Sequence, residues 1–242
     1  MKEKFDLIIE LYSNGLNKSQ ISKITGIPRT TVRDWINKSP QKFVDKIFNP
    51  LEFLTNEKIS NYSYILGLYL GDGFINKCKR TYRLRISLDK KYNSVNEMVK
   101  NCLSSIFNNK INVVKRGNCV DISLYNNNLP YFFPQHGKGK KYLRKIILTE
   151  WQNQILSPIN LIKGLIHSDG CYYNEKIKNY TYGRFVFTNK SKDIIQIFCN
   201  ALDILNLEYD VQKIDGIYRV RISKKSSVVK LKEMIGTKEN PI

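Results

Sequence analysis

The sequence lacks paired cysteines, long apolar runs and an even balance of charge. Its five cysteines are scattered and form no Cys-x-x-Cys pair, which argues against a disulfide framework and against a structural zinc site. No apolar run is long enough to span a bilayer, and acidic residues interrupt the apolar N-terminal stretch, which is unlike a signal peptide. We therefore expect a protein of the reducing cytoplasm.

The charge balance indicates a polyanionic partner. Forty lysines and arginines outnumber 21 acidic residues, giving a formal net charge of +19 over 242 residues. Such a surplus destabilises a compact protein by self-repulsion unless a polyanion relieves it, and nucleic acid is the usual one. The hydrophobic share of 42% is that of a globular chain, so the alternative is a folded protein with a merely basic, solvated surface.

Three short helical patterns occupy residues 1–40. They lie at 5–15, 17–26 and 27–38, and a glycine closes each of the first two. This order predicts a helix-turn-helix domain, similar to the small trihelical domains of resolvases and bacterial regulators, followed by a linker over 41–60. The residues at the start of the third helix that we expect to contact DNA are Arg29, Thr30, Thr31 and Arg33. A three-helix packing domain that binds nothing is the alternative.

The rest of the chain repeats itself. The apolar segment 62–73 has a partner at 158–170, and each is followed by a hairpin pattern, an amphipathic helix and a second hairpin. A repeat of roughly a hundred residues is too long for a solenoid unit. The predicted fold class is therefore α+β, with two pseudo-symmetric αββαββ halves over 61–157 and 158–242 after a small all-α domain.

Alternation in the predicted strands gives each half one apolar and one polar face, as at 82–88 and 218–223. A sheet with arginine, lysine and serine on one face suits the major groove, where arginine reads guanine edges and clamps phosphates. An ordinary solvated face is the alternative for one strand, and recurrence in both halves disfavours it. We expect Lys115 to share this face with Ser123 and Tyr125. The full predicted DNA-contacting set of the strands is Arg83, Arg85, Ser87, Lys115, Arg184, Thr188, Arg219, Arg221 and Ser223.

Two helical segments end in Asp-Gly, one running from Ile65 to Gly73 (ILGLYLGDG) and the other from Ile162 to Gly170 (IKGLIHSDG). Each carries two small residues four positions apart, which lie on one face of a helix and let two helix backbones pack closely. Such packing would bring Asp72 and Asp169 side by side, and each following glycine would take the left-handed conformation that ends a helix. Two neighbouring carboxylates repel unless a cation lies between them, and oxygen ligands favour Mg²⁺.

Both segments resemble the LAGLIDADG motif, and the resemblance to single-chain homing endonucleases with two such motifs covers about residues 60–236. It implies that both halves form a saddle on DNA and that the chain is a monomer. It also implies sequence-specific hydrolysis of both strands of a long, nearly asymmetric double-stranded DNA site, with Mg²⁺ as cofactor and Ca²⁺ or Mn²⁺ able to replace it for binding. The alternative for the two aspartates is that they merely cap their helices.

The resemblance also implies site residues. Metal ligands would come from Asp72, Asp169, Gly71 and Ser168. The family places a polar residue at a strand end and a basic residue near each scissile phosphate. The strand-end positions correspond to Asp89 and Asn189, and the basic ones to Lys138 or Lys140 and to Lys238. The expected catalytic set is Asp72, Asp169, Asn189, Lys140 and Lys238.

Two residues depart from the family pattern. Lys163 puts a charge on the second motif helix, and His167 stands where an acid is common. We expect His167 to be a packing residue, because the only other histidine, His136, is not nearby in sequence.

Two other functions remain open. The first is a DNA-binding transcription regulator with a LAGLIDADG-like domain that no longer cleaves, although such relatives have lost the acids that Asp72 and Asp169 preserve. The second is an RNA splicing cofactor, against which the helix-turn-helix favours duplex DNA.

Overall fold

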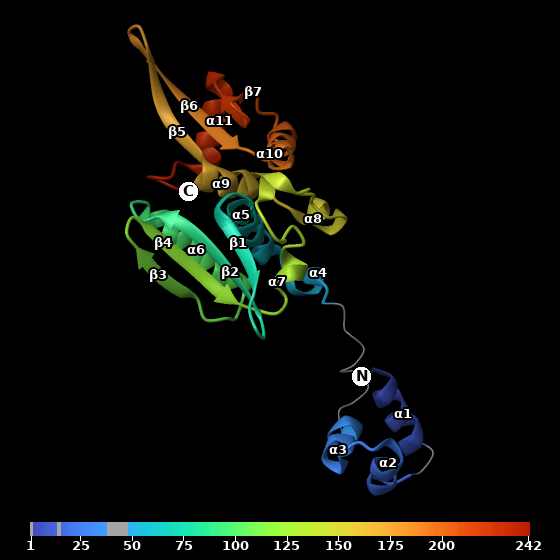
Figure 1. Cartoon of the computed structure of the whole chain (residues 1–242). Helices are drawn as coiled ribbons and strands as arrows, with labels where there is room; N and C mark the ends of the chain where they lie inside the picture. The colour runs from blue at the N-terminus through green and yellow to red at the C-terminus, as the bar shows by residue number, and fades with distance from the viewer. Residues whose placement is uncertain (1, 14–15, 38–47) are drawn as a thin grey trace. The chain divides into compact units, whose positions relative to one another are not determined.

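The computed structural model describes residues 2–13, 16–37 and 48–242, and the chain divides into two compact units, 1–48 and 49–242 (Figure 1). The helices of the first unit are α1 (Lys2–Ser13), α2 (Lys18–Thr25) and α3 (Arg29–Asn37). Among the described residues, none of the helices is both long and apolar enough to cross a membrane.

The first unit is a small three-helix domain. The Asn17 side chain caps α2 by accepting from the backbone N–H groups of Ser19 and Gln20, and the Gln20 side chain completes a capping box. Gly26 ends α2 with a φ of 67°, a left-handed conformation that favours glycine. The core of this unit is formed by Ile8, Ile21 and Val32. The predicted end of the first helix at Gly15 lies outside the described residues.

The second unit contains two αββαββ repeats, which confirms the predicted fold class. The first half consists of α4 (Pro50–Phe53), α5 (Asn56–Asp72), β1 (Gly73–Lys77), β2 (Tyr82–Asp89), α6 (Asn93–Ile106), β3 (Asn112–Arg116) and β4 (Cys119–Tyr125). The second half consists of α9 (Pro158–Asp169), β5 (Gly170–Ile177), β6 (Tyr180–Asn189), α10 (Lys192–Ile204), β7 (Asp210–Ile214), β8 (Ile217–Ile222) and α11 (Lys225–Ile235). Between the halves lies a connector with α7 (Leu129–Phe132), a 3-10 turn (Lys141–Leu143) and α8 (Glu150–Ile155). The predicted linker 41–60 is described only from residue 48, and there it contains α4 and the start of α5.

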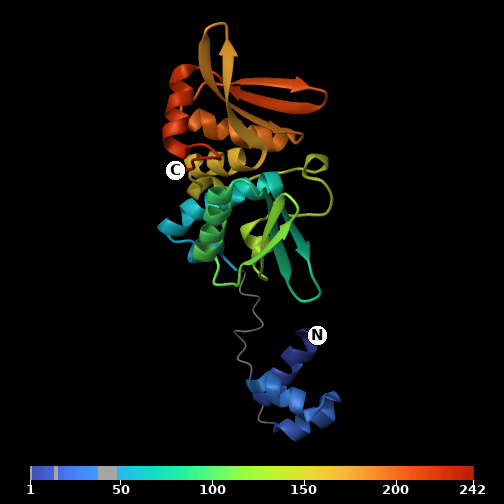
Figure 2. The ribbon, with the colours of Figure 1, turned by 90° about the vertical axis from the view of Figure 1, so that its left-hand side faces the viewer.

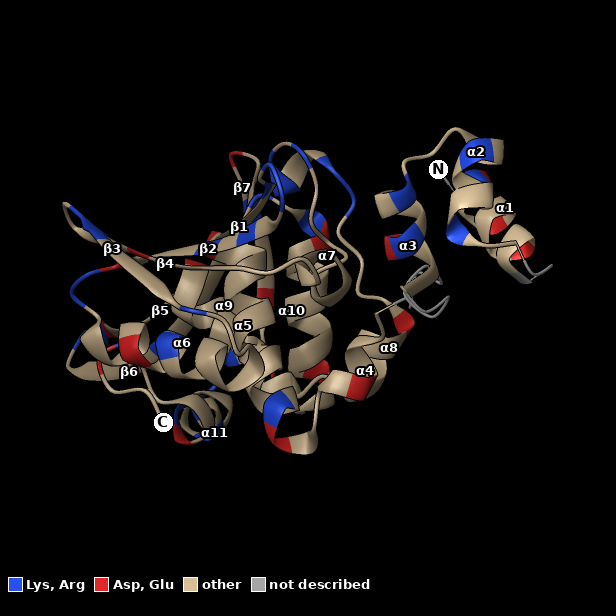
Figure 3. Ribbon diagram, turned by 90° about the horizontal axis from the view of Figure 1, so that it is seen from below, with Lys and Arg blue, Asp and Glu red and all other residues tan. Residues whose placement is uncertain are grey.

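Each half forms an antiparallel four-stranded sheet, in the orders β1-β2-β4-β3 and β5-β6-β8-β7. Helix α6 packs on one face of the first sheet, and α10 and α11 pack on one face of the second (Figures 1 and 2). Under these helices lie fully buried apolar side chains, such as Leu84 and Ile86 in β2 and Phe185 and Phe187 in β6. The strict alternation of these strands leaves the arginines on the opposite, uncovered face. Lys and Arg positions occur along the strands and loops near β1 and β3, with acidic positions among them (Figure 3).

The two halves meet along α5 and α9, which lie side by side (Figures 1 and 2). A Cβ on Gly67 would stand 2.5 Å from the Leu161 carbonyl oxygen, and one on Gly164 would stand 2.2 Å from the Tyr64 carbonyl oxygen. Contacts this short are not tolerated, so only glycine permits the approach. The predicted pairing of the two small-faced helices is therefore present.

Candidate active site at the ends of the helix pair

The helix pair ends with Asp72 on α5 and Asp169 on α9. At this junction of the helix ends, Asp169 lies against the facing helix, since a Cβ on Gly71 would stand 3.0 Å from Asp169 Oδ2, and Asp72 is close enough for the Asp169 charge to raise its pKa. Our prediction of a left-handed glycine after each aspartate is wrong. Gly73 and Gly170 have φ values of −85° and −105°, because each helix runs directly into a strand.

The glycines are required there for space. A Cβ on Gly73 would stand 2.4 Å from the Tyr69 Cα atom, and one on Gly170 would stand 2.7 Å from the Ile166 Cα atom. Each strand therefore starts against the last turn of its own helix, and this tight turn aims the preceding aspartate at the junction.

The junction disfavours two negative charges. Desolvation raises the pKa of Asp72 to about 6, and the neighbouring Asp169 adds to the rise, while Lys238 and Lys141 oppose it. Desolvation also raises the pKa of Asp169, against the hydrogen bond that Asn189 Nδ2 donates to its Oδ2 at 2.8 Å. A cation between the carboxylates would relieve this repulsion.

Each helix end also holds a lysine. Lys141 Nζ donates to the carbonyl oxygens of Tyr69, Gly71 and Gly73 at 2.5, 3.0 and 2.7 Å, at the negative end of the α5 dipole. Lys238 Nζ donates to the Ser168 carbonyl oxygen at 2.9 Å, at the end of α9.

Burial lowers the pKa of Lys141 to about 8, although both aspartates favour its charged form. Lys140, the residue predicted for this place, lines the same cavity as Lys141 but does not contact the helix end. Lys140 is exposed, with its Nζ 5.7 Å from the Tyr142 ring centroid, because the 3-10 turn beginning at Lys141 directs that neighbouring side chain to the helix end instead. Lys138, the other candidate, is exposed as well.

The two ends form equivalent sets of residues. A cavity of about 660 Å³ is lined by Asp169, Asn189, Gly71 and Lys141, and also by Lys140. A second cavity of about 240 Å³ is lined by Asp72, Asp89, Ser168 and Lys238, and also by His167. Each set therefore combines an acid of one half, the last small residue of the other half's helix, a strand-end residue and a lysine. The predicted strand-end residues Asp89 and Asn189 occupy matching positions.

The strand-end residues behave differently. Asn189 is bonded to Asp169, whereas Asp89 accepts from the Lys91 backbone N–H at 2.9 Å and pairs with the Lys91 ammonium at 3.5 Å. That backbone hydrogen bond is the main cause that lowers the pKa of Asp89. The first end thus carries one more carboxylate than the second.

A buried polar network holds the connector in place. Gln152 Nε2 donates to the Tyr62 hydroxyl at 2.7 Å, and the Tyr62 hydroxyl donates to the Phe132 carbonyl at 2.6 Å. Gln135 Nε2 donates to Gln152 Oε1 at 2.5 Å, and Arg144 Nη1 donates to the Gln135 carbonyl at 2.5 Å. Because Arg144 follows the 3-10 turn, this network fixes the segment that presents Lys141. Sequence reasoning missed it, since isolated glutamines in a non-periodic segment give no signal.

On the first sheet, Arg83, Arg85 and Ser87 share the uncovered face, as their register opposite Tyr125, Ser123 and Asp121 requires.

The prediction that Lys115 shares this face is wrong. Lys115 pairs with Val120 and therefore points to the other side, while Arg116 lies on the arginine face with its Nε 3.6 Å from Asp121. A shift of one residue along a strand reverses its side chains, and the sequence of β3 does not determine the register.

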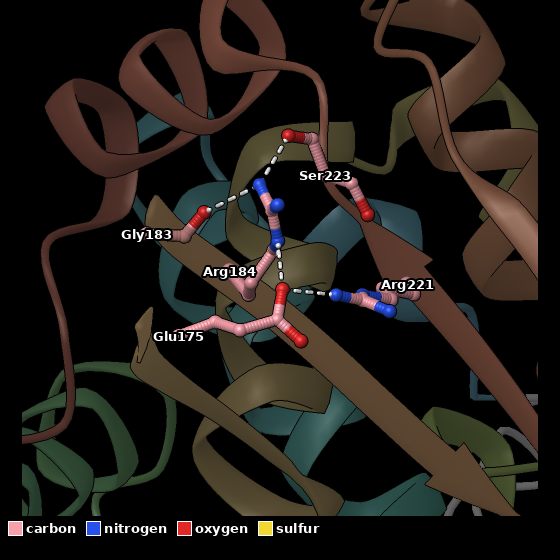
Figure 4. A network of polar contacts seen from close by, with 5 residues as sticks. All are labelled: Glu175, Gly183, Arg184, Arg221 and Ser223. Atoms are coloured by element: carbon pink, nitrogen blue, oxygen red, sulfur yellow. Dashed lines mark hydrogen bonds and ion pairs between the residues drawn. The ribbon is translucent and has the colours of Figure 1, made fainter. Parts of the chain in front are cut away.

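On the second sheet, Thr188, Arg219 and Arg221 share the uncovered face with Arg184. The Arg184 side chain is only 11% exposed, because Nε donates to Glu175 Oε2 at 3.0 Å and Nη1 donates to the Ser223 carbonyl at 2.7 Å (Figure 4). Two of its nitrogens are thus engaged within the protein.

The remaining predicted residues lie as follows. His167 is 3% exposed, and its Nδ1 lies 2.8 Å from the Tyr64 hydroxyl, as expected of a packing residue. Burial lowers the pKa of His167 to about 3, so its ring is neutral. Lys163 is buried, and its Nζ donates to the Ile242 carbonyl. In the separate N-terminal unit, Arg29, Thr30 and Arg33 are exposed and Thr31 is half-buried.

The oxygen donors at the junction fit a small divalent cation. No group of three His, Cys, Asp or Glu side chains arranged for a metal occurs in the part of the chain that the structure describes. The carbonyls of Gly71 and Ser168 each take a lysine ammonium but keep a second lone pair. Mg²⁺ is usually bound through one or two carboxylates with water and substrate phosphates, so Asp72, Asp169 and these carbonyls suit it once phosphate is present.

Family models match three parts of the chain. A homeodomain-like domain model matches residues 2–39, a WhiA LAGLIDADG-like domain model matches 61–123, and a LAGLIDADG-like domain model matches 158–236. The fold and the paired motif helices thus define a protein with two LAGLIDADG-like domains. The chain therefore contains two LAGLIDADG-like domains, preceded by a homeodomain-like domain.

A curated relative is similar in sequence to much of the chain, and solved structures share its fold. The Uncharacterized protein MJ0314 of Methanocaldococcus jannaschii is 26% identical over 181 residues, which are 73% of this chain and 65% of that protein. The chain therefore spans less than two thirds of this curated relative. The homing endonuclease I-DmoI in complex with DNA and Mn is similar with a TM-score of 0.51 and 21% identity, over 74% of this chain and 97% of that one. The N-terminal LAGLIDADG domain of DUF199/WhiA has a TM-score of 0.51 and 13% identity, over 76% of this chain and 86% of that one.

Proposed function

We propose that this chain is a sequence-specific endonuclease of homing type that hydrolyses both strands of a long, nearly asymmetric double-stranded DNA site. The observation that carries the proposal is the pair of equivalent acid-and-lysine sets at the ends of α5 and α9. Two sets of this kind match two scissile phosphates. A protein that only binds DNA needs neither a repelling carboxylate pair nor a lysine at each helix end.

Asp72 and Asp169 would hold Mg²⁺ together with the carbonyls of Gly71 and Ser168. When bound, Mg²⁺ supplies Lewis acidity that polarises a phosphate and activates water. The chain's own groups act beside it. Asn189 orients the Asp169 carboxylate, and the ammonium groups of Lys141 and Lys238 stabilise negative charge as it develops on each phosphate.

The surface around the site suits duplex DNA. The net charge of +19 attracts phosphates, and each sheet presents arginines on the face that no helix covers. I-DmoI has been solved with DNA and with Mg, Mn or Ca, which supports double-stranded DNA as partner and Mg²⁺ as cofactor, with Ca²⁺ or Mn²⁺ able to support binding. A chain with two LAGLIDADG-like halves needs no second copy, so we propose a monomer.

The helix-turn-helix domain would add a second DNA contact through Arg29, Thr30, Thr31 and Arg33. Deletion of residues 1–40 should weaken DNA binding by about tenfold or more through lost phosphate contacts. It should spare cleavage at high protein concentration. Loss of all nicking by the truncated protein would contradict this accessory role.

A DNA-binding regulator is the second candidate, and the WhiA LAGLIDADG-like model that matches residues 61–123 favours it. Selection of cleaved duplexes from a random library with Mg²⁺, beside a binding selection with Ca²⁺, separates the two. We expect one sequence to emerge from both selections. Selective binding without any cutting by the wild type would favour the regulator.

A further inference from the structure

Glu175 is an acid on the uncovered face of the second sheet, which carries Asp210 of β7, opposite Arg221, as well as its arginines. It lies on β5 opposite Tyr182 of β6. Its Oε2 accepts from Arg184 Nε at 3.0 Å and from Arg221 Nη2 at 2.5 Å, so one carboxylate oxygen joins arginines from β6 and β8 (Figure 4).

The two arginines have different freedom. Arg184 is 11% exposed and also donates to the Ser223 carbonyl at 2.7 Å, so it ties β5, β6 and β8 together. Arg221 is 33% exposed, and within the described residues its guanidinium donates only to Glu175. Glu175 therefore holds one arginine that braces the sheet and one that is a third exposed. The Arg221 Nε is buried without a partner, so its terminal nitrogens are the ones available to an outside acceptor.

Glu175 also keeps an acceptor. Its second oxygen, Oε1, accepts no hydrogen bond from the residues that the structure describes, and no contact is drawn to it in Figure 4. The Glu175 side chain is 30% exposed. An open acceptor and an oriented donor thus stand side by side on the face that is free of helices.

This donor and acceptor complement a particular base pair. In the major groove, guanine presents the acceptors N7 and O6, and its paired cytosine presents the donor N4–H₂ beside O6. Arginine is the commonest partner of guanine, and carboxylates accept from cytosine N4. No other base pair offers two acceptors on one base and a donor on its partner.

We propose that Glu175 and Arg221 read one G·C pair, with Arg221 on the guanine and Glu175 on the cytosine. Arg184 is a positioning residue that fixes Glu175. This rests on the proposed function in so far as the uncovered face of the second sheet enters the major groove. Loss of the Glu175 charge would leave two arginines without their shared anion, so that Arg221 would turn to phosphates and add sequence-independent binding.

The test is a binding selection on random duplexes in Ca²⁺ with the full chain, its Glu175→Gln and Arg221→Gln variants, and Glu233→Gln as control. Glu233 is an exposed residue of α11, so its substitution makes the same charge change on the helix-covered side. We expect the wild type to prefer G·C at one position by about tenfold or more. Both sheet variants should lose this preference at that same position and keep the others. Glu175→Gln should bind non-cognate DNA at least as tightly as the control, whereas Arg221→Gln, which loses a positive charge, should bind it more weakly.

A preference that Glu175→Gln leaves intact, or losses at two different positions, would overturn the inference alone. Glu175→Asp keeps the charge and should retain part of the preference, which checks the proposal if the glutamine variant folds poorly. Because the selection measures binding without Mg²⁺, a protein that binds selectively and never cuts would contradict the endonuclease proposal but not this one. Absence of selective DNA binding by the wild type would contradict both.

Discussion

The two ends of the helix pair are built alike but are not equal. Both contain an acid, a carbonyl of the facing helix and a lysine, yet Asp72 has the carboxylate Asp89 at its strand end where Asp169 has the amide of Asn189. Lys141 donates to three carbonyls, whereas Lys238 donates to one. The comparison shows that the two repeats share the acid, the carbonyl and the lysine at the helix ends and differ in the residue at the strand end.

The largest expected effect comes from removing either acid. Asp72→Asn or Asp169→Asn should abolish double-strand cleavage, with a loss of about 100-fold or more, because each removes a charged metal ligand from the site. DNA affinity measured in Ca²⁺ should stay nearly unchanged, as the sheets provide most contacts. Supercoiled plasmid separates intact, nicked and linear products, and persistent linear product from either variant would refute the two-aspartate mechanism.

Replacement of the lysines should slow cleavage to different extents, most for Lys141, less for Lys238 and least for Lys140. Lys141→Met removes a cation that three carbonyls and two aspartates surround, so we expect a loss of cleavage of about 100-fold, against about tenfold for Lys238→Met. Lys140→Met is the matched control, because Lys140 lines the same cavity without reaching the helix end, and it should change the rate by less than about threefold. A larger loss for Lys140→Met than for Lys141→Met in single-turnover cleavage would reverse our assignment of the basic residue.

The helix pair could be predicted because its signal is periodic. Gly67 and Gly71 are four residues apart in one motif helix, as are Gly164 and Ser168 in the other, and an aspartate follows each pair. The strands at 82–88 and 218–223 alternate strictly. Lys141 could not be separated from Lys138 and Lys140 by sequence, since only the 3-10 turn and the buried network around Gln152 select it. The face of the sheet on which Lys115 lies could not be predicted either, because it depends on the register of β3 against β4.

Glu175 was missed for a related reason. Glu175 on β5 contacts Arg221 on β8, and β6 lies between these two strands in the sheet. A contact between strands that are far apart in sequence leaves no periodic signal in either strand. Pairwise contacts of this kind follow from sheet order and twist, which single-strand patterns do not contain.

The strand-end difference can be exchanged. In the double variant Asp89→Asn with Asn189→Asp, the extra carboxylate moves to the other end, and we expect the ratio of nicks on the two strands to shift by about fivefold, the equivalent of about 1 kcal/mol. The reason is that a second acid near one aspartate strengthens cation binding at that end. Strand-specific end labels measure the ratio over time. An unchanged ratio, with both single variants still cutting, would mean that the strand-end residue does not distinguish the two sites.

The smallest effect is on stability without metal. The pKa of Asp72 is raised from its ordinary 3.8 to about 6, so the folded state holds this proton more tightly than the unfolded state. Stability is therefore lost as pH rises through this window, and the loss is complete above pH 6. The full shift corresponds to about 3 kcal/mol, and solvent screening of the exposed carboxylate reduces it to about 1 kcal/mol, or about 2–4 °C in Tm.

Asp72→Asn should consequently match the wild type near pH 4 and melt about 2–4 °C higher at pH 7.5 in EDTA. Asp89→Asn supplies the opposite case. The pKa of Asp89 is lowered, so its ionised form stabilises the fold above its unfolded pKa, and this contribution disappears as pH falls through its folded pKa. The Asp89→Asn variant should therefore melt below the wild type at pH 7.5. If calorimetry at neutral pH showed that both substitutions raise Tm, or that both lower it, repulsion at the junction would not explain the difference between Asp72 and Asp89.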